Sequence, residues 1–247
     1  MTGSSSSSGA VGMYDGGSGA GGADSGSGSG VASGDGGGCP AGAVFCDDFE
    51  SGTMLGAAWT VDNSVTANTV TVVSTKSHSG SNSVHMTFTT ASCATFIDEK
   101  MGVTATGTVW GRVWLYPNTE TDGGHDVYLE GEPATFKGGS SNTGVRPLNT
   151  EGGDMTINVD PPDNGPSSKM ALPRAAWHCF EWQITNIGGN GNVVLYMDST
   201  LLATDTGVAI PALAEMRVGY ERYGAGTTTG DMYIDDYAIG PMRLGCN

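Results

Sequence analysis

The residues best suited to chemistry form an alternating strip between Thr108 and Tyr116. Within it, Trp110, Arg112 and Trp114 alternate with smaller or apolar residues, as in a β-strand whose side chains point in turn to opposite faces. Sugar rings stack on aromatic faces, and a guanidinium offers planar hydrogen-bond donors to hydroxyl and carboxylate groups. The strip therefore predicts a sugar-binding face that contains Trp110, Arg112 and Trp114.

Two other runs add polar side chains to an outward face by the same alternation. Glu181 and Gln183 alternate with large apolar residues, and Asn158 lies between Ile157 and Val159. We expect Glu181, Gln183 and Asn158 to share the outward face with the tryptophans. The alternative is that the outward aromatic and polar residues form a second buried layer under a long loop.

Short β-rich runs, separated by clusters of Gly, Asn, Asp and Pro, must position these residues. The runs expected to be strands include Thr69 to Thr75, Ser83 to Thr90, Thr108 to Tyr116, Met155 to Val159, Trp177 to Thr185, Asn192 to Met197, Met216 to Tyr223 and Met232 to Ile239. Neither a sustained apolar stripe of helical period nor a sequence repeat is present. The predicted fold class is therefore all-β, with two antiparallel sheets packed as a sandwich.

The composition of the chain changes at residue 38. Residues 1–38 contain 15 Gly and 10 Ser and lack Lys, Arg, Glu, Phe, Trp, Leu and Ile. Such a segment cannot bury enough apolar surface to offset the entropy lost on ordering. We expect a disordered Gly/Ser-rich linker there and one domain over residues 39–247.

Charge and cysteine content limit the expected partners. The net charge of the chain is −16, of which −13 belongs to residues 39–247, so nucleic acid and anionic membranes are repelled. No run approaches the apolar length of a membrane span. Five cysteines without CxxC spacing indicate disulfides formed in an oxidising compartment, and the four histidines show no zinc-binding spacing. We expect an extracellular or cell-surface monomer whose secretory signal or lipid anchor is absent from this chain.

Six segments carry a family resemblance. They are Cys39-Pro40, Val44 to Gly52, His78 to Val84, Trp177 to Trp182, Arg217 to Tyr223 and Tyr233 to Gly240. Together they resemble a group of secreted bacterial proteins in the concanavalin A-like lectin/glucanase superfamily, similar to the alginate- and glucuronan-lyase jelly rolls. The resemblance covers essentially all of residues 39–247 and implies a concanavalin A-like jelly-roll β-sandwich whose concave face meets carbohydrate. It does not fix the activity, because this superfamily includes lectins, hydrolases and lyases.

The resemblance also implies a structural Ca²⁺ ion. In similar jelly rolls an acid of the first strand, an aspartate of the last strand and an intervening turn bind the ion. Those positions correspond here to Glu50, Asp235 and the turn from Ser79 to Asn82. Oxygen ligands from three separated segments suit calcium. Asp236 is the alternative to Asp235, because the phase of the strand decides which carboxylate faces the turn.

For a polysaccharide lyase, the resemblance implies a set of Arg, Asn or Gln, His and Tyr. The C5 proton of a uronate can be removed only when its carboxylate is neutralised and the developing charge is stabilised. The matching residues are Arg112, Arg146 and Asn158 as the clamp on the carboxylate, His125 as the base, and Tyr223 as the acid or as a shared acid and base.

Other functions stay open beside the lyase. A retaining hydrolase needs two carboxyl groups about 5 Å apart, but the Glu-x-Asp-x-x-Glu pattern of glucanases is absent. Glu181 and Glu221 are isolated acids, which we expect to contact substrate together with the tryptophans and Gln183. The domain charge of −13 favours a non-catalytic sugar-binding module on a surface tether, because an acidic protein attracts polyanions poorly. A structural surface domain is the third alternative. The Arg, Asn, His and Tyr set favours a lyase that cleaves a uronate polysaccharide by β-elimination.

A disulfide pairing follows from one assumed strand register. If Glu50 and Asp236 lie opposite each other on antiparallel strands, residue 40 lies opposite Cys246. The predicted pairs are then Cys39 with Cys246 and Cys46 with Cys179, which leaves Cys93, outside the family motifs, as the free thiol.

Overall fold

The structure of the protein is a computed structural model. It describes residues 39–89, 93–100, 106–118, 124–139, 143–161, 165–223 and 229–247. All of these residues belong to one compact unit, Val31–Asn247. The expected linker, residues 1–38, lies outside the described residues. Within the described ranges we find no helix of the length and apolar character needed to cross a membrane.

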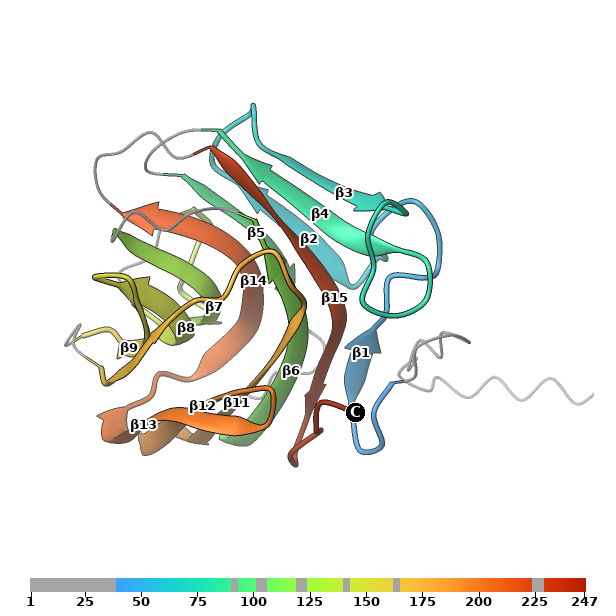
Figure 1. Cartoon of the computed structure of the whole chain (residues 1–247). Coiled ribbons are helices and arrows are strands. Elements are labelled where there is room, and N and C mark those ends of the chain that lie inside the picture. Colours follow the sequence, from blue (N-terminus) through green and yellow to red (C-terminus); the bar gives the residue numbers. More distant parts are fainter. Residues whose placement is uncertain are drawn as a thin grey trace, which may run out of the picture. The chain divides into compact units, whose positions relative to one another are not determined.

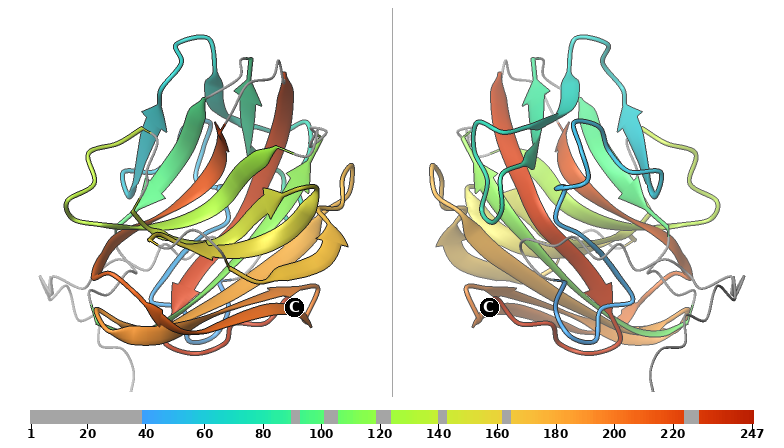
Figure 2. Two further views of the ribbon diagram at one scale, coloured as in Figure 1. Left: turned by 90° about the vertical axis from the view of Figure 1, so that its left-hand side faces the viewer. Right: turned by 90° about the vertical axis from the view of Figure 1, so that its right-hand side faces the viewer.

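Fifteen strands in the described residues form two antiparallel sheets, as predicted. Sheet A contains, in spatial order, β13 (Thr200–Ala209), β12 (Asn190–Met197), β11 (His178–Ile187), β6 (Gly107–Pro117), β15 (Gly230–Gly240), β4 (Ser83–Phe88) and β3 (Thr69–Val73), and β1 (Phe45–Asp47) pairs with β15. Sheet B contains β10 (Ser167–Ala171), β9 (Asp154–Val159), β8 (Val145–Glu151), β7 (His125–Pro133), β14 (Leu213–Tyr223), β5 (Ala94–Glu99) and β2 (Trp59–Asn63). The sheets pack face to face (Figures 1 and 2).

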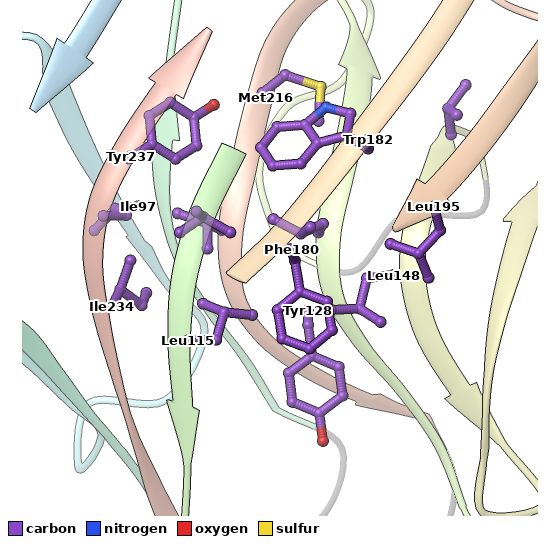
Figure 3. Packing of buried hydrophobic residues seen from close by; sticks show 14 of the residues in the cluster. Ile97, Leu115, Tyr128, Leu148, Phe180, Trp182, Leu195, Met216, Ile234 and Tyr237 are labelled. Carbon is purple, nitrogen blue, oxygen red and sulfur yellow. The ribbon is translucent and has the colours of Figure 1, made fainter. Parts of the chain in front are cut away.

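One apolar core lies between the two sheets. Trp182 of β11 is fully buried, and its ring centroid lies 6.0 Å from that of Tyr237 of β15; Figure 3 shows both within the core. Gly111 of β6 makes room for the indole, because a Cβ atom there would lie 2.0 Å from Trp182 Cζ2. The core therefore depends on a glycine directly beneath its largest side chain.

Period-two alternation correctly separates inward from outward residues. The residues predicted to point inward are all buried in the core: Val109, Val113, Leu115, Phe180, Trp182, Ile184, Met155, Ile157 and Val159. However, β6 and β11 belong to sheet A and β9 belongs to sheet B. Their outward residues lie on the two opposite outer faces of the sandwich, so the expectation of one shared sugar-binding face is wrong.

The disulfides differ from the predicted pairs. Cys39 bonds to Cys46 and Cys179 bonds to Cys246, while Cys93 is free and buried, as predicted. The assumed register, with Glu50 opposite Asp236, differs by two residues from the observed register. In the structure β1 ends at Asp47, which pairs with Tyr237 of β15. After Gly240 the chain leaves β15, and its C-terminal tail (residues 241–247) crosses to β11.

We predict that the two disulfides contribute unequally to stability. They close loops with sequence separations of 7 and 67 residues. Loop entropy then gives roughly 2–3 kcal/mol for Cys39–Cys46 and roughly 4 kcal/mol for Cys179–Cys246. Paired serine variants compared by urea unfolding should show the larger loss for Cys179→Ser with Cys246→Ser. Equal losses, or peptide mapping that joins Cys39 to Cys246, would contradict the pairing.

Candidate active site

His125, Arg146 and Tyr223 meet on the outer face of sheet B. β7 lies between β14 and β8, and His125 and Tyr223 are Cα partners in the β7–β14 ladder. Their ring centroids are 5.1 Å apart. Arg146 of β8 donates from Nη2 to the Tyr223 hydroxyl at 3.2 Å. The structure thus brings together the predicted base, the predicted acid and one of the two predicted arginines.

Asn149 belongs to the same group and was missed from the sequence. Its Nδ2 atom lies 3.2 Å from Nε2 of His125. The β8–β9 register shifts between Arg146 and Asn149, so two residues three positions apart share one face. Strict alternation would have placed them on opposite faces. We call His125, Arg146, Asn149 and Tyr223 the Tyr223 cluster.

Two other predicted residues lie beside the cluster. Asn158 of β9 is 2% exposed and is the Cα partner of Arg146. Glu221 of β14 is fully buried two residues before Tyr223. Gly219, also on β14, leaves no room for a sugar, because a Cβ atom there would lie 2.2 Å from the carbonyl oxygen of Thr95.

The guanidinium group of Arg146 is already hydrogen-bonded to carboxylates of the protein. Its Nε atom donates to Glu130 Oε1 at 2.8 Å, and its Nη1 atom donates to Asp160 Oδ2. Burial alone would lower the pKa of Arg146, but Glu130, Tyr223 and Asp160 outweigh burial and raise it. The guanidinium therefore holds Tyr223 in place, and the predicted role as a clamp on the substrate does not fit its contacts.

The environment of Tyr223 favours the neutral phenol. Burial raises the pKa of Tyr223, Arg146 opposes this, and the carboxylates of Glu221 and Glu130 raise the pKa further. The hydroxyl consequently keeps its proton well above neutral pH. A group in this state can donate a proton to a leaving oxygen.

Arg112 does not lie with the Tyr223 cluster. It belongs to β6 of sheet A, is 3% exposed, and donates to the carbonyl oxygens of Gly245 and Asn247 at 3.4 Å each. Its side chain is thus buried beneath the C-terminal tail. The expectation that Arg112 and Asn158 share one substrate carboxylate is wrong, because alternation fixes the side of a strand but not the sheet to which the strand belongs.

The predicted sugar contacts of sheet A also make contacts within the chain, although Trp110, Trp114 and Gln183 are only half-buried. Trp114 stacks on His78 with 3.5 Å between ring centroids, and Trp110 stacks on Tyr196. Glu181 accepts hydrogen bonds from Arg243 and from the backbone N–H of Gly245. These residues fit the alternative of a second layer under a loop. Gln183, the remaining predicted contact, also lies on β11 of sheet A.

A second ion cluster, also missed from the sequence, lies farther along β14. Arg217 is fully buried and donates to Asp98 Oδ1 and Glu130 Oε2 at 3.2 Å and to Asp62 Oδ2 at 3.0 Å. Its guanidinium also lies against the rings of Phe96 and Phe136. Burial raises the pKa of Asp98 to about 6, Arg217 opposes this shift, and Glu215 and Asp62 add to it.

The residues expected to bind calcium converge on one turn. Glu50 Oε1 accepts the backbone N–H groups of Ser81 and Asn82 at 2.8 and 2.6 Å. Asp235 Oδ2 accepts those of His78 and Ser79 at 2.7 and 3.3 Å. Among the described residues no group of three or more His, Cys, Asp or Glu side chains is arranged to hold a metal ion.

The charge of this turn is compatible with a cation. β15 is irregular after Asp235, and Asp236 adopts a positive φ of 48°, so both carboxylates face residues 78 and 79. Burial and the neighbouring Asp236 raise the pKa of Asp235 to about 8, although backbone N–H groups oppose the shift. A bound cation would relieve that repulsion, and the oxygen-rich set of Glu50, Ser79, Asn82 and Asp235 suits a hard ion.

Comparison with known proteins gives a family and two solved relatives of the same fold. The family model for polysaccharide-lyase-like proteins described as "Cip1-like, core domain" matches residues 48–242. The structure titled "Cellulose induced protein, Cip1" is 21% identical with a TM-score of 0.68, over 82% of this chain and 100% of that one. An endo-β-1,4-glucuronan lyase from the fungus Trichoderma reesei is 15% identical with a TM-score of 0.62, over 81% and 96% of the two chains. No curated protein sequence matches significantly.

We predict that protonation of Asp98 stabilises the protein. Its pKa rises from 3.8 to about 6 on folding, so the folded state binds the proton more tightly. This contribution, roughly 1–3 kcal/mol, is complete below about pH 4 and is lost as the pH rises through about 6. Melting temperatures across this range should fall with rising pH, and the fall should shrink in Asp98→Asn. An unchanged slope in that variant would exclude Asp98 as the titrating group.

Proposed function

The chain belongs to the Cip1-like family of polysaccharide-lyase-like proteins, and on this premise we propose that it cleaves a uronate-containing polysaccharide by β-elimination. The observation that carries the proposal is the convergence of His125, Asn149 and Tyr223 on the outer face of sheet B, with Arg146 fixing the phenol. Family membership supports a carbohydrate-active protein. The reaction type rests on the chemistry of these side chains.

In the proposed reaction, amide groups replace arginine as the clamp on the carboxylate. Asn149 and Asn158 lie on the face of Tyr223, and an amide N–H group donates a hydrogen bond without carrying a positive charge. Hydrogen bonds from these amides stabilise the negative charge that develops on the uronate carboxylate as the C5 proton leaves. The arginines of this face cannot take that role, because Glu130 and other acids already engage them.

His125 and Tyr223 then divide the proton transfers. His125 accepts the proton from C5, the electron pair of that bond forms the C4=C5 double bond, and the C4–O bond breaks. Tyr223, kept neutral by its surroundings, donates its proton to the departing glycosidic oxygen. If the amide oxygen of Asn149 faces Nε2, the imidazole carries its own proton there and keeps Nδ1 as the acceptor.

The alternative function is a sugar-binding module without catalysis. The acidity of the protein favours it, because the domain charge of −13 repels polyanions at long range. The two functions differ in their product: only the lyase forms a new double bond.

We also propose an extracellular location and a structural calcium ion. Two disulfides are consistent with an oxidising compartment. Glu50, Ser79, Asn82 and Asp235 would hold the ion, which would tie the chain after β1 to β15 and to the turn before β4. We propose further that the protein acts as a monomer on its polysaccharide.

We predict that His125→Ala and Tyr223→Phe each reduce turnover of a uronate polymer by about 10²–10⁴-fold while binding persists, because each variant removes one proton transfer. The measurement is ultraviolet absorbance of the unsaturated product from polyglucuronate, alginate and polygalacturonate. Gln183→Ala, on the other sheet, is the matched control and should retain full activity.

Two results would overturn the lyase. Sugar binding without an unsaturated product from any of the three polymers would make the protein a lectin. Reducing ends formed without the double bond would make it a hydrolase.

For calcium, we predict a rise in melting temperature that Glu50→Ala and Asp235→Ala abolish. An ion that binds only the folded state adds about 2.7 kcal/mol at roughly 100 times its Kd. Asp154→Ala, which removes an acid far from the turn, should keep the rise. Identical melting curves in chelator and in excess calcium would refute the site.

A further inference from the structure

A cavity opens on the outer face of sheet B, away from the Tyr223 cluster. It has a volume of about 350 Å³ and is lined by Asp62, Asp98, Lys100, Phe136, Lys137 and Glu215 among others. These residues come from β2, β5, β14 and the segment after β7. We call this cavity the Asp98 pocket.

The acids of the Asp98 pocket are held in fixed positions. Arg217 donates to Oδ1 of Asp98 and to Oδ2 of Asp62, and the backbone N–H of Gly139 also donates to Asp62 at 2.6 Å. The side chain of Asp98 is 7% exposed and lines the cavity. The pocket therefore presents a preorganised hydrogen-bond acceptor to a ligand.

The charges of the pocket select against a second uronate. Three carboxylates line it, and Lys100 is already paired with Glu215 at 3.2 Å. The ammonium group of Lys137 donates to the carbonyl oxygen of Ala134, on the rim. Asp98 and Asp62 would repel a ligand carboxylate, whereas both would accept hydrogen bonds from hydroxyl groups. A polyhydroxylated ligand without charge suits this lining, and the ring of Phe136 offers an apolar side.

The pocket and the Tyr223 cluster can serve one polymer. Arg217 and Tyr223 are six residues apart on β14 and share the outer face, which corresponds to roughly 20 Å along the strand. Glu130 links the two sites, because it accepts from both Arg146 and Arg217. A polysaccharide that lies across this face would span both with several sugar units.

We propose that the Asp98 pocket is a binding site for a neutral sugar unit, so that the substrate is a mixed polysaccharide in which uronates alternate with, or are flanked by, neutral sugars. This inference rests on the proposed lyase function for the uronate at Tyr223. Binding in the Asp98 pocket does not depend on the lyase reaction, because it requires only hydroxyl groups on the ligand.

The experiment measures binding by calorimetry to the full chain carrying Tyr223→Phe, so that turnover does not interfere. The probes are neutral pentasaccharides of glucose, xylose and mannose, with pentaglucuronate for comparison. We expect at least one neutral probe to bind, and Asp98→Asn to weaken it about tenfold or more, because a charged acceptor is lost. Lys137→Ala, an exposed change that spares the fold, should also weaken binding of the neutral probe, because Lys137 lines the cavity. The matched control Asp154→Asn should leave this binding unchanged.

The outcomes separate this inference from the proposed function. If no neutral probe binds, or if Asp98→Asn and Lys137→Ala both leave its affinity unchanged, the Asp98 pocket is not a neutral-sugar site, whatever the lyase assay shows. Tighter binding of pentaglucuronate than of every neutral probe, lost in Asp98→Asn, would also overturn it. Failure of the lyase alone appears as absent unsaturated product with the neutral-sugar binding intact.

Discussion

The outer face of sheet B depends on one buried carboxylate, Glu130. It is fully buried and accepts hydrogen bonds from both Arg146 and Arg217. Loss of one partner from such a buried ion cluster leaves an uncompensated charge and typically costs about 3–5 kcal/mol. Glu130 thereby fixes two guanidinium groups at once. One positions the phenol of Tyr223, and the other positions the carboxylates of the Asp98 pocket.

This arrangement is compatible with the proposal that an acidic protein binds an acidic polymer. The arginines of the face are neutralised within the protein, so a uronate would be met by amides, an imidazole and a neutral phenol. Such groups stabilise a developing charge without attracting polyanions from a distance. For the proposed lyase, the sign of the domain charge would therefore bear on the rate of encounter with substrate and not on the proton transfers at Tyr223.

The sequence predicted the sandwich and the inward or outward side of each strand that was analysed, because alternation follows directly from strand geometry. It could not assign strands to sheets, since pairing is a long-range property, and Asn158 of sheet B was therefore wrongly expected to share one face with Arg112 and the tryptophans of sheet A. Asn149 was missed because none of the runs expected to be strands covered β8, and the register shift in β8 breaks the alternation that a strand prediction would have used. The cysteine pairs were wrong because the path of the C-terminal tail leaves no periodic pattern in the sequence.

A crystal structure of Tyr223→Phe with a bound uronate oligosaccharide tests the central claim most directly. The account predicts a uronate whose C5 atom lies beside His125, whose carboxylate contacts Asn149 and Asn158, and whose glycosidic oxygen lies at the position of the missing hydroxyl. An oligosaccharide bound instead to the outer face of sheet A, or lying on sheet B with its carboxylate turned away from both amides, would contradict it.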